Sequence, residues 1–234
     1  MGIAAIRRDL RKLGSPRKAR ELQRFFKTGP GEYGEGDVFL GVRVPELRAL
    51  VRRYADLPLD RVPALLGSRI HEERLFALLL LVRQFSRGDQ AVRTAVYELY
   101  MARTAAVNNW DLVDLSAAKI VGAHLEDRDR SRLDTLTGSG SLWERRIAIV
   151  ATLHFIRQGD LADTFRIADR LLGDPEDLIH KAVGWMLREA GKRDRAAEEA
   201  FLRPRYASMP RTMLRYAIER FPEPLRQDYL KGRV

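Results

Sequence analysis

The sequence contains no cysteine, which excludes a disulfide framework, a thiolate nucleophile and a metal site built from thiolates. Long apolar runs are also missing: the longest, Leu75 to Val82, is far too short to span a bilayer. The first residues, Met1 to Leu13, are rich in charge and carry no apolar run of signal-peptide length. These absences predict a cytoplasmic protein, and we expect no membrane partner.

Histidine is scarce, and its spacing does not favour a metal site. The segment HEERL at 71–75 begins like a zinc-binding helix, but Leu75 stands where the second histidine would be needed. The other histidines, His124, His154 and His180, lie far apart in the sequence. Phosphate-binding loops, dinucleotide fingerprints and nucleophile elbows are absent as well. We therefore expect no metal and no cofactor.

Positive charge is abundant. The 234 residues include 42 Lys and Arg against 32 Asp and Glu, a net charge of +10, while 45% of the residues are hydrophobic. Such an excess favours a polyanionic partner, either nucleic acid or an acidic membrane surface. The alternative is an arginine-rich proteome in which these side chains form ordinary solvated faces.

The pattern of apolar residues predicts helices throughout. Four windows rich in Ala, Leu, Arg and Glu show apolar residues at three- and four-residue spacing: Pro45–Tyr54, Glu72–Phe85, Val92–Arg103 and Trp143–Arg157. Sustained two-residue alternation is missing, so we expect no strands. Gly followed by Asp or Ser at 88–89, 138–140, 159–160 and 173–175 predicts helix ends and new caps, and Ser208-Met209-Pro210 predicts one more start.

One long irregular stretch is expected at Thr28–Gly41, which is dense in glycine and contains Tyr33 and Phe39. Loops of this length within a compact chain are often functional, although a plain connector has the same composition.

An internal repeat is the most informative pattern. Similar segments begin at His71, Ser141, Asp177 and Ser208, and each carries a basic residue just before an apolar stripe. With Trp110 at the midpoint of the first two, the equivalent positions are spaced by 36, 36, 35 and 30 residues. A period in this range with two helices per unit is typical of an α-solenoid. We call these equivalent residues the five repeat positions: Arg74, Trp110, Arg146, Lys181 and Arg211.

The repeat predicts a shared binding surface, because equivalent positions of stacked units line one face. One helical turn after the repeat positions come Leu78, Asp114, Val150, Trp185 and Arg215. That surface would hold five basic residues, two tryptophans and one carboxylate, a combination suited to a phosphate backbone with sugars or bases beside it.

Each of these residues also has a purely structural interpretation. Trp110 and Trp185 could seal one helix layer against the next. Asp114 could pair with a neighbouring Arg or with Lys119. Asp111 is better explained as an acidic residue in the first turn of a helix. The coincidence of two four-residue pairs, Trp110 with Asp114 and Lys181 with Trp185, favours function.

At these residues the chain resembles the AlkD-like family of bacterial DNA alkylation-repair glycosylases. The resemblance covers roughly Tyr33 to Phe221 and is sharpest in NWDLVD at Asn109–Asp114, LWERRIAI at Leu142–Ile149 and HKAVGWMLRE at His180–Glu189. FLGVRVPELRAL from Phe39 and MPRTMLRYAIERF from Met209 are similar to the family's N- and C-terminal patterns.

The resemblance implies a HEAT-like solenoid, a curved right-handed stack of antiparallel helix pairs that forms one domain over residues 1–234 and has a basic concave face. It assigns the catalytic aspartate to Asp114, the lesion-flanking tryptophans to Trp110 and Trp185, and a phosphate-binding arginine to Arg146. The family's N-terminal tyrosine corresponds to Tyr33, although the spacing to Leu40-Gly41 is one residue short.

The sequence thus predicts a monomeric glycosylase that removes cationic alkylated purines from double-stranded DNA. Its expected phosphate contacts are Arg146, Lys181, Arg74, Arg211 and Arg215. Two rivals share the fold: a non-catalytic nucleic-acid-binding solenoid, which has no use for Asp114, and a protein scaffold, whose groove need not be basic.

Overall fold

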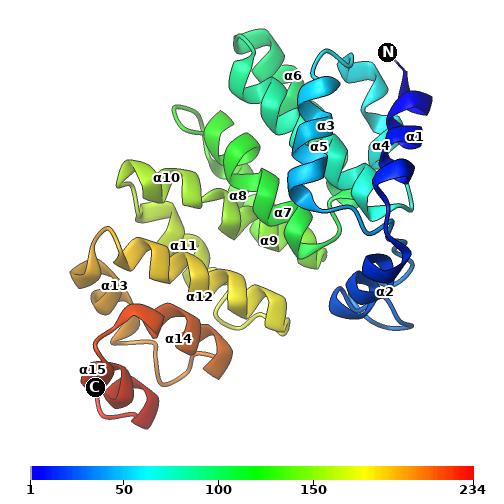
Figure 1. Ribbon diagram of the computed structural model, residues 1–234. Coiled ribbons are helices and arrows are strands. Elements are labelled where there is room, and N and C mark those ends of the chain that lie inside the picture. Colours follow the sequence, from blue (N-terminus) through cyan, green and yellow to red (C-terminus); the bar gives the residue numbers. More distant parts are fainter. Residues whose placement is uncertain (1) are drawn as a thin grey trace. The chain divides into compact units, whose positions relative to one another are not determined.

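The computed structural model describes residues 2–234 and is built from helices, most of them joined by short turns, with a long irregular connection between residues 25 and 44 (Figure 1). Over these residues no β-strand forms, and a single parallel bridge joins Val38 to Ile70. The predicted all-α class is confirmed, and successive helices agree with an α-solenoid. None of the helices in the described part of the chain is long and apolar enough to cross a membrane.

The chain divides into two compact units, Met1–Ser116 and Ala117–Val234. Large apolar side chains such as Phe76 in the first unit and Phe155 in the second are buried almost completely. The prediction of one domain over residues 1–234 and the predicted right-handed curvature of the stack stay predictions.

The first unit carries the N-terminal helices and ends within α7. Its elements are α1 (Ile3–Leu13), α2 (Pro16–Phe25), α3 (Val44–Arg53), η1 (Leu59–Arg61), α4 (Pro63–Leu66), α5 (His71–Arg87), α6 (Gln90–Met101), η2 (Thr104–Ala106) and α7 (Trp110–Ala117). The second unit continues with η3 (Ala118–Gly122), α8 (Ser131–Thr137), α9 (Leu142–Ala151), α10 (Leu153–Gln158), α11 (Ala162–Arg170), α12 (Asp177–Gly191), α13 (Arg195–Leu202), α14 (Arg211–Ala217), η4 (Ile218–Arg220) and α15 (Glu223–Lys231).

The four predicted helical windows all fall on helices, with one interruption. The window Trp143–Arg157 is divided at Thr152 into α9 and α10. The Thr152 hydroxyl donates a hydrogen bond to the carbonyl of Ile149 at 2.7 Å, an interaction that competes with the helical ladder. The predicted start at Met209-Pro210 lies one residue early, because Pro210 precedes α14 rather than occupying its first position.

Of the four predicted Gly-Asp or Gly-Ser steps, the one at 88–89 provides a side-chain cap, whereas α9, α11 and α12 begin without one. Asp89 directly precedes α6, and its carboxylate accepts the backbone N–H of Val92 at 2.9 Å. Asp194 does the same for α13 by accepting from Ala197 at 2.9 Å. These bonds satisfy amide groups that have no partner within the helix.

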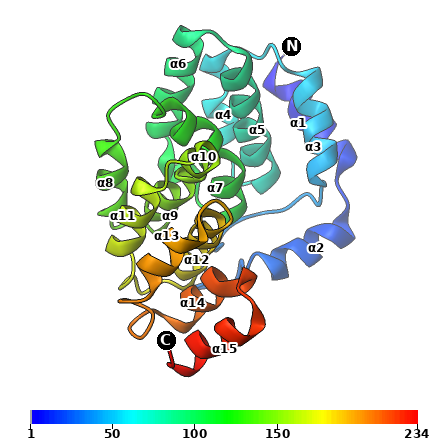
Figure 2. The same ribbon diagram turned by 90° about the vertical axis from the view of Figure 1, so that its left-hand side faces the viewer.

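Helix α5 organises the first unit, where it packs against α3, α4 and α6 (Figure 2). Its first turn is polar yet buried: His71, Glu72, Glu73 and Arg74 are each at most 4% exposed. The Glu72 carboxylate accepts three consecutive backbone N–H groups, from Leu40 at 2.9 Å, Gly41 at 2.7 Å and Val42 at 3.2 Å. This contact fixes the end of the irregular stretch at Thr28–Gly41, which the structure confirms as non-helical.

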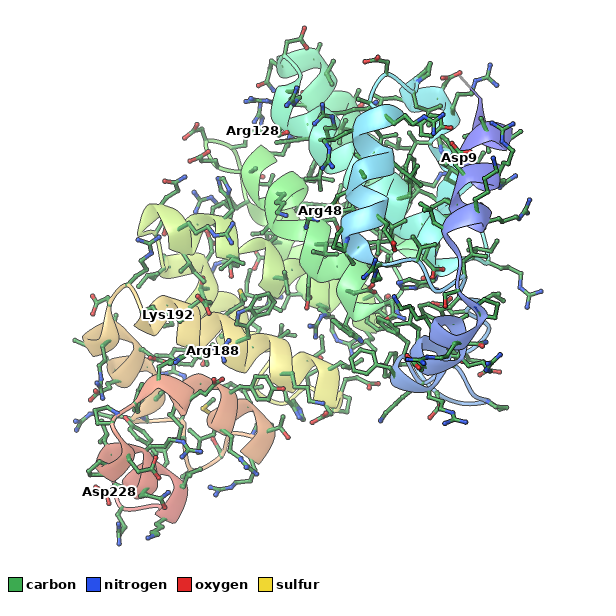
Figure 3. All side chains as sticks on the ribbon, viewed as in Figure 1. Asp9, Arg48, Arg128, Arg188, Lys192 and Asp228 are labelled. Atoms are coloured by element: carbon green, nitrogen blue, oxygen red, sulfur yellow. The ribbon has the colours of Figure 1, made fainter. Side chains whose placement is uncertain are left out.

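Helices α12 and α14 lie side by side in the second unit (Figures 1 and 2). Gly184 permits this approach, because a Cβ at this position would lie 2.4 Å from the carbonyl oxygen of Met213. Arg188 of α12, labelled in Figure 3, forms an ion pair with Glu219 of η4, the element that follows α14. The glycine of the motif HKAVGWMLRE therefore serves helix packing.

Candidate functional site

Trp110 and Asp114 stand one turn apart on α7, and both side chains are half-buried. Between them, Leu112 and Val113 are completely buried. Because residues four apart share one face of a helix, α7 directs its apolar side into the core and leaves Trp110 and Asp114 at the margin of the packed interior.

An aromatic cluster surrounds Trp110. Its ring stacks on Phe26 at a centroid distance of 5.1 Å with an interplanar angle of 18°, and it meets Phe25 edge-on at 5.9 Å. The indole N–H donates to the hydroxyl of Tyr33 at 3.3 Å, across 77 residues of sequence. Phe25 is 63% exposed, an unusual position for so large an apolar side chain. The structure thus brings Tyr33 to Trp110.

The backbone of Trp110 is held by its neighbour Asn109, which is completely buried. The Asn109 side-chain oxygen accepts the N–H of Trp110 at 2.8 Å. The side-chain amide of Asn109 donates a hydrogen bond to Asp37 Oδ2 at an N···O distance of 3.5 Å. Asp37 belongs to the irregular stretch, so a residue of this stretch helps to hold the first turn of α7 in place.

His71 lies between two carboxylates. Its Nδ1 is 3.2 Å from Asp37 Oδ2 and its Nε2 is 2.8 Å from Asp111 Oδ2. Burial disfavours the charged imidazole, but the hydrogen bonds to Asp111 and Asp37 outweigh that effect and raise the pKa of His71 to about 9. For Asp37, burial is likewise outweighed, by His71 and Arg74, so its pKa lies below the ordinary value. His71 is therefore a cation at neutral pH.

A cavity of about 450 Å³ adjoins the same residues. Phe25 and Phe26, which contact Trp110, form part of its wall together with Phe39, and His71 and Asp111 also line it. Its lining is mainly apolar, with charged side chains from α2 and from Arg43, the residue before α3, among the lining residues.

The charge of Asp114 acts on Tyr100, a fully buried residue of α6. The Tyr100 hydroxyl and the Ser116 hydroxyl share a hydrogen bond of 3.0 Å. Burial raises the pKa of Tyr100 and the negative charge of Asp114 raises it further. Tyr100 thus keeps its proton beside the carboxylate.

Arg74, one of the predicted phosphate contacts, lies in the interior of the structure. Arg74 is 4% exposed, and its guanidinium donates to Asp37 Oδ1 at 2.6 Å and to the carbonyl of Ser68 at 2.9 Å. A buried, ion-paired arginine would have to abandon both partners before it could reach a phosphate. Its role is to neutralise Asp37.

In the second unit, Arg146 and Lys181 occupy different surroundings. Arg146 is 5% exposed, and its guanidinium donates to the carbonyl of Leu178. Lys181 remains 40% exposed at its side chain and pairs with Asp177 at 2.7 Å. Trp185, one turn after Lys181 on α12, is half-buried.

Arg211 and Arg215 are exposed on α14. Burial thus differs among the five repeat positions, all of which fall within the first five residues of a helix. One turn later, Leu78 and Val150 are buried whereas Arg215 is exposed. The repeat positions therefore all lie near the N-terminal end of a helix, but they differ in how far they are exposed to solvent.

Sequence reasoning missed Asp37, His71 and the pair Phe25–Phe26. The acidic residue of EGD at 35–37 carried no motif, and His71 was considered only as a metal ligand. The sequence did contain a signal for this buried polar cluster. The segment HEERLFALLLL is the most apolar helix and is therefore expected to lie in the core, where the charged residues at its start need partners.

Comparison with known proteins agrees with the helical fold. Residues 6–221 match the family model described as DNA alkylation repair enzyme. A solved structure described as a predicted DNA alkylation repair enzyme from Enterococcus faecalis superimposes with a TM-score of 0.69. It shares 19% sequence identity, and the match covers 90% of this chain and 97% of that one. Among curated proteins no match was found.

The chain belongs to the DNA alkylation repair enzyme family, whose model spans nearly its whole length. Membership supports an enzyme role in the repair of alkylated DNA. The similarity to the Enterococcus faecalis protein, at its low identity, shows a shared helical fold.

Proposed function

We propose that this protein is a DNA glycosylase that hydrolyses the N-glycosidic bond of cationic alkylated purines, such as 3-methyladenine and 7-methylguanine, in double-stranded DNA. The observation that carries the proposal is the placement of Asp114 at the half-buried margin of α7, one turn from Trp110, in a chain of the alkylation repair family. A carboxylate has no use in a surface that only binds phosphates.

The chemistry follows from the charge of the lesion. Alkylation at N3 or N7 makes the purine cationic, so the base leaves as a neutral molecule when the bond to C1′ breaks. The sugar then passes through an oxocarbenium-like state, as in glycoside hydrolysis. A carboxylate near C1′ stabilises this developing cation and orients the attacking water, and we assign that role to Asp114.

The aromatic and basic residues receive supporting roles. Trp110 offers a π face to the deoxyribose and the cationic nucleotide, and Tyr33, hydrogen-bonded to it, shares this contact. Trp185 has the same role from α12. Arg146, Lys181, Arg211 and Arg215 are proposed to hold phosphates, and Arg146 would leave the carbonyl of Leu178 to do so. Arg74 is left out of this set because its guanidinium neutralises the buried carboxylate of Asp37.

A single carboxylate limits the range of substrates. A cationic base departs without being protonated, so one aspartate suffices. A neutral base such as uracil or 8-oxoguanine would depart as a poor anionic leaving group, and its release should be slow.

The decisive experiment is the substitution Asp114→Asn. Asparagine retains the size of the side chain but removes the charge that the transition state needs, so excision should fall by roughly 10²–10³-fold. Binding to DNA should persist or improve, because a charge that repels phosphate has gone. The measurement is single-turnover release of 7-methylguanine and 3-methyladenine, with uracil-containing duplex as the neutral comparison.

Asp89→Asn is the matched control, because asparagine caps a helix as well as aspartate and the protein loses the same charge. Full activity of Asp114→Asn, or release of uracil as fast as 7-methylguanine, would contradict the mechanism. Duplex binding without excision by the wild type would favour the non-catalytic nucleic-acid-binding solenoid instead, and absence of DNA binding would favour the scaffold.

A further inference from the structure

A buried cluster of charged and amide side chains joins three elements of the first unit. Its members are Asp37 of the irregular stretch, His71 and Arg74 of α5, and Asn109 and Asp111 at the start of α7. His71 is 1% exposed, Arg74 4% and Asp37 6%, and Asn109 is completely buried. Charges so far from water persist only when they are paired.

The hydrogen bonds define the charge state of the imidazole. Each ring nitrogen of His71 faces a carboxylate oxygen, at 3.2 Å for Asp37 and 2.8 Å for Asp111. A neutral imidazole has one donor, so one of its nitrogens would direct a lone pair at an anion, whereas the cation donates to both. With Arg74 on Asp37, two cations then balance two carboxylates.

Both sequence neighbours of Trp110 are attached to this cluster. Asn109 donates to Asp37 and accepts the backbone N–H of Trp110, while Asp111 accepts from His71. The rings are in contact as well, since His71 stacks on Phe39 at 4.5 Å, Phe39 on Phe26 at 5.0 Å, and Phe26 on Trp110 at 5.1 Å.

We propose that His71 is a positioning residue: as a cation between Asp37 and Asp111, it locks the first turn of α7 and thereby sets the orientation of Trp110 and, one turn later, of Asp114. The consequence for catalysis rests on the proposed glycosylase function, while the structural consequence does not. Deprotonation of His71 weakens its contacts with the two carboxylates and frees the first turn of α7, so the geometry of the site is sensitive to alkaline pH.

The pH window follows from the groups that face His71. Asp111 and Asp37 favour its cation, and Arg74 opposes it. Glu72, Lys18, Glu21 and Arg43 line the adjoining cavity, and Glu72 is already bound by three backbone amides. With a pKa of about 9 against 6.5 for a free histidine, the cation's contribution to folding is complete below 6.5 and is lost as pH rises through 9.

The test uses the full chain labelled with 5-fluorotryptophan and followed by fluorine NMR. The three tryptophans give three signals, which single Trp→Phe variants assign. We expect the Trp110 signal of the wild type to titrate with a midpoint near 9. Asp111→Asn keeps an acceptor for His71 but removes its charge, so the midpoint should fall by roughly 1–3 units.

His71→Gln should abolish that titration and lower kcat for 7-methylguanine release by roughly 10²-fold, the loss that a misplacement of about 1 Å causes, with the Kd for DNA unchanged. His154→Gln is the control, because His154 also pairs with a carboxylate, Glu126 at 3.1 Å, in the second unit. It should leave the Trp110 signal and kcat as they are.

A Trp110 signal that ignores pH, or a midpoint that is the same in wild type and Asp111→Asn, would overturn the proposal. If His71→Gln fails to fold, the comparison with Asp111→Asn still decides. If the wild type releases no alkylated base, the proposed function fails, yet the fluorine titration remains readable, so the two failures are distinguishable.

Discussion

At the scale of single residues, Glu198 is a carboxyl group whose burial disfavours its charged form. It lies on α13 with 2% exposure, and its Oε1 has no hydrogen-bond partner within residues 2–234. Burial raises its pKa to about 8, although Arg195 and Arg188 act in the opposite direction. Between 4.5 and 8 the folded chain therefore holds a proton that the unfolded chain has released, and stability falls as pH rises.

We expect Glu198→Gln to stabilise the protein by an amount that grows from pH 5 to pH 8, because glutamine keeps the shape of the protonated carboxyl group and does not ionise. Urea unfolding at several pH values measures the difference from wild type. Glu98→Gln, at an exposed position of α6, should show no such pH-dependent gain. A constant difference for Glu198→Gln across this range would show that the carboxyl group is not protonated in the folded state.

At the scale of the helices, Gly184 decides how closely α12 and α14 pack. Alanine is better than glycine within a helix by about 1 kcal/mol, so propensity alone favours Gly184→Ala. Its Cβ, however, would lie 2.4 Å from the backbone oxygen of Met213 and 2.5 Å from Cβ of Tyr216. Overpacking costs about 1–3 kcal/mol, and contacts this short with a backbone atom place the cost at about 2–3 kcal/mol, so the balance should be a loss of roughly 1–2 kcal/mol and a Tm several degrees lower.

Gly173→Ala provides the comparison for this prediction, because nothing lies within 4 Å of a Cβ at that position in the turn before α12. It should be neutral or slightly stabilising, since alanine restricts the unfolded chain. Calorimetry of the two variants measures both effects. An unchanged or higher Tm for Gly184→Ala would mean that α12 and α14 separate at little cost.

At the scale of the whole molecule, the net charge of +10 predicts DNA binding that weakens steeply with salt. Without Arg74, four predicted phosphate contacts remain: Arg146, Lys181, Arg211 and Arg215. If all four neutralise phosphates, log affinity should fall with log salt at a slope of about −3 to −4. Fluorescence anisotropy with a labelled duplex at several salt concentrations measures this slope.

Reversing Arg211 and Arg215 to Glu should reduce the magnitude of that slope by about 2 and weaken binding to all sequences alike, since phosphate contacts carry no sequence information. Arg132 on α8 and Arg193 after α12, also exposed, provide a variant with the same change in net charge. Equal weakening by both pairs would show that overall charge, not α14, attracts the DNA.

Much of this protein follows from the sequence alone, because helices depend on local periodicity. The four apolar windows, the cap at Gly88-Asp89 and the irregular stretch at Thr28–Gly41 were predicted from neighbours within a few residues. The placement of Trp110 and Asp114 on one face of a helix follows from their four-residue spacing.

Burial and pairing were decided by the tertiary structure. Arg74 occupies the repeat position equivalent to that of the exposed Arg211, yet it pairs with Asp37 in the interior. The carboxylates that contact His71 lie 34 and 40 residues away in the sequence, and Tyr33, which contacts Trp110, lies 77 residues away. A repeat period places residues on equivalent helices, but a charge is exposed or buried according to what the rest of the chain packs around it.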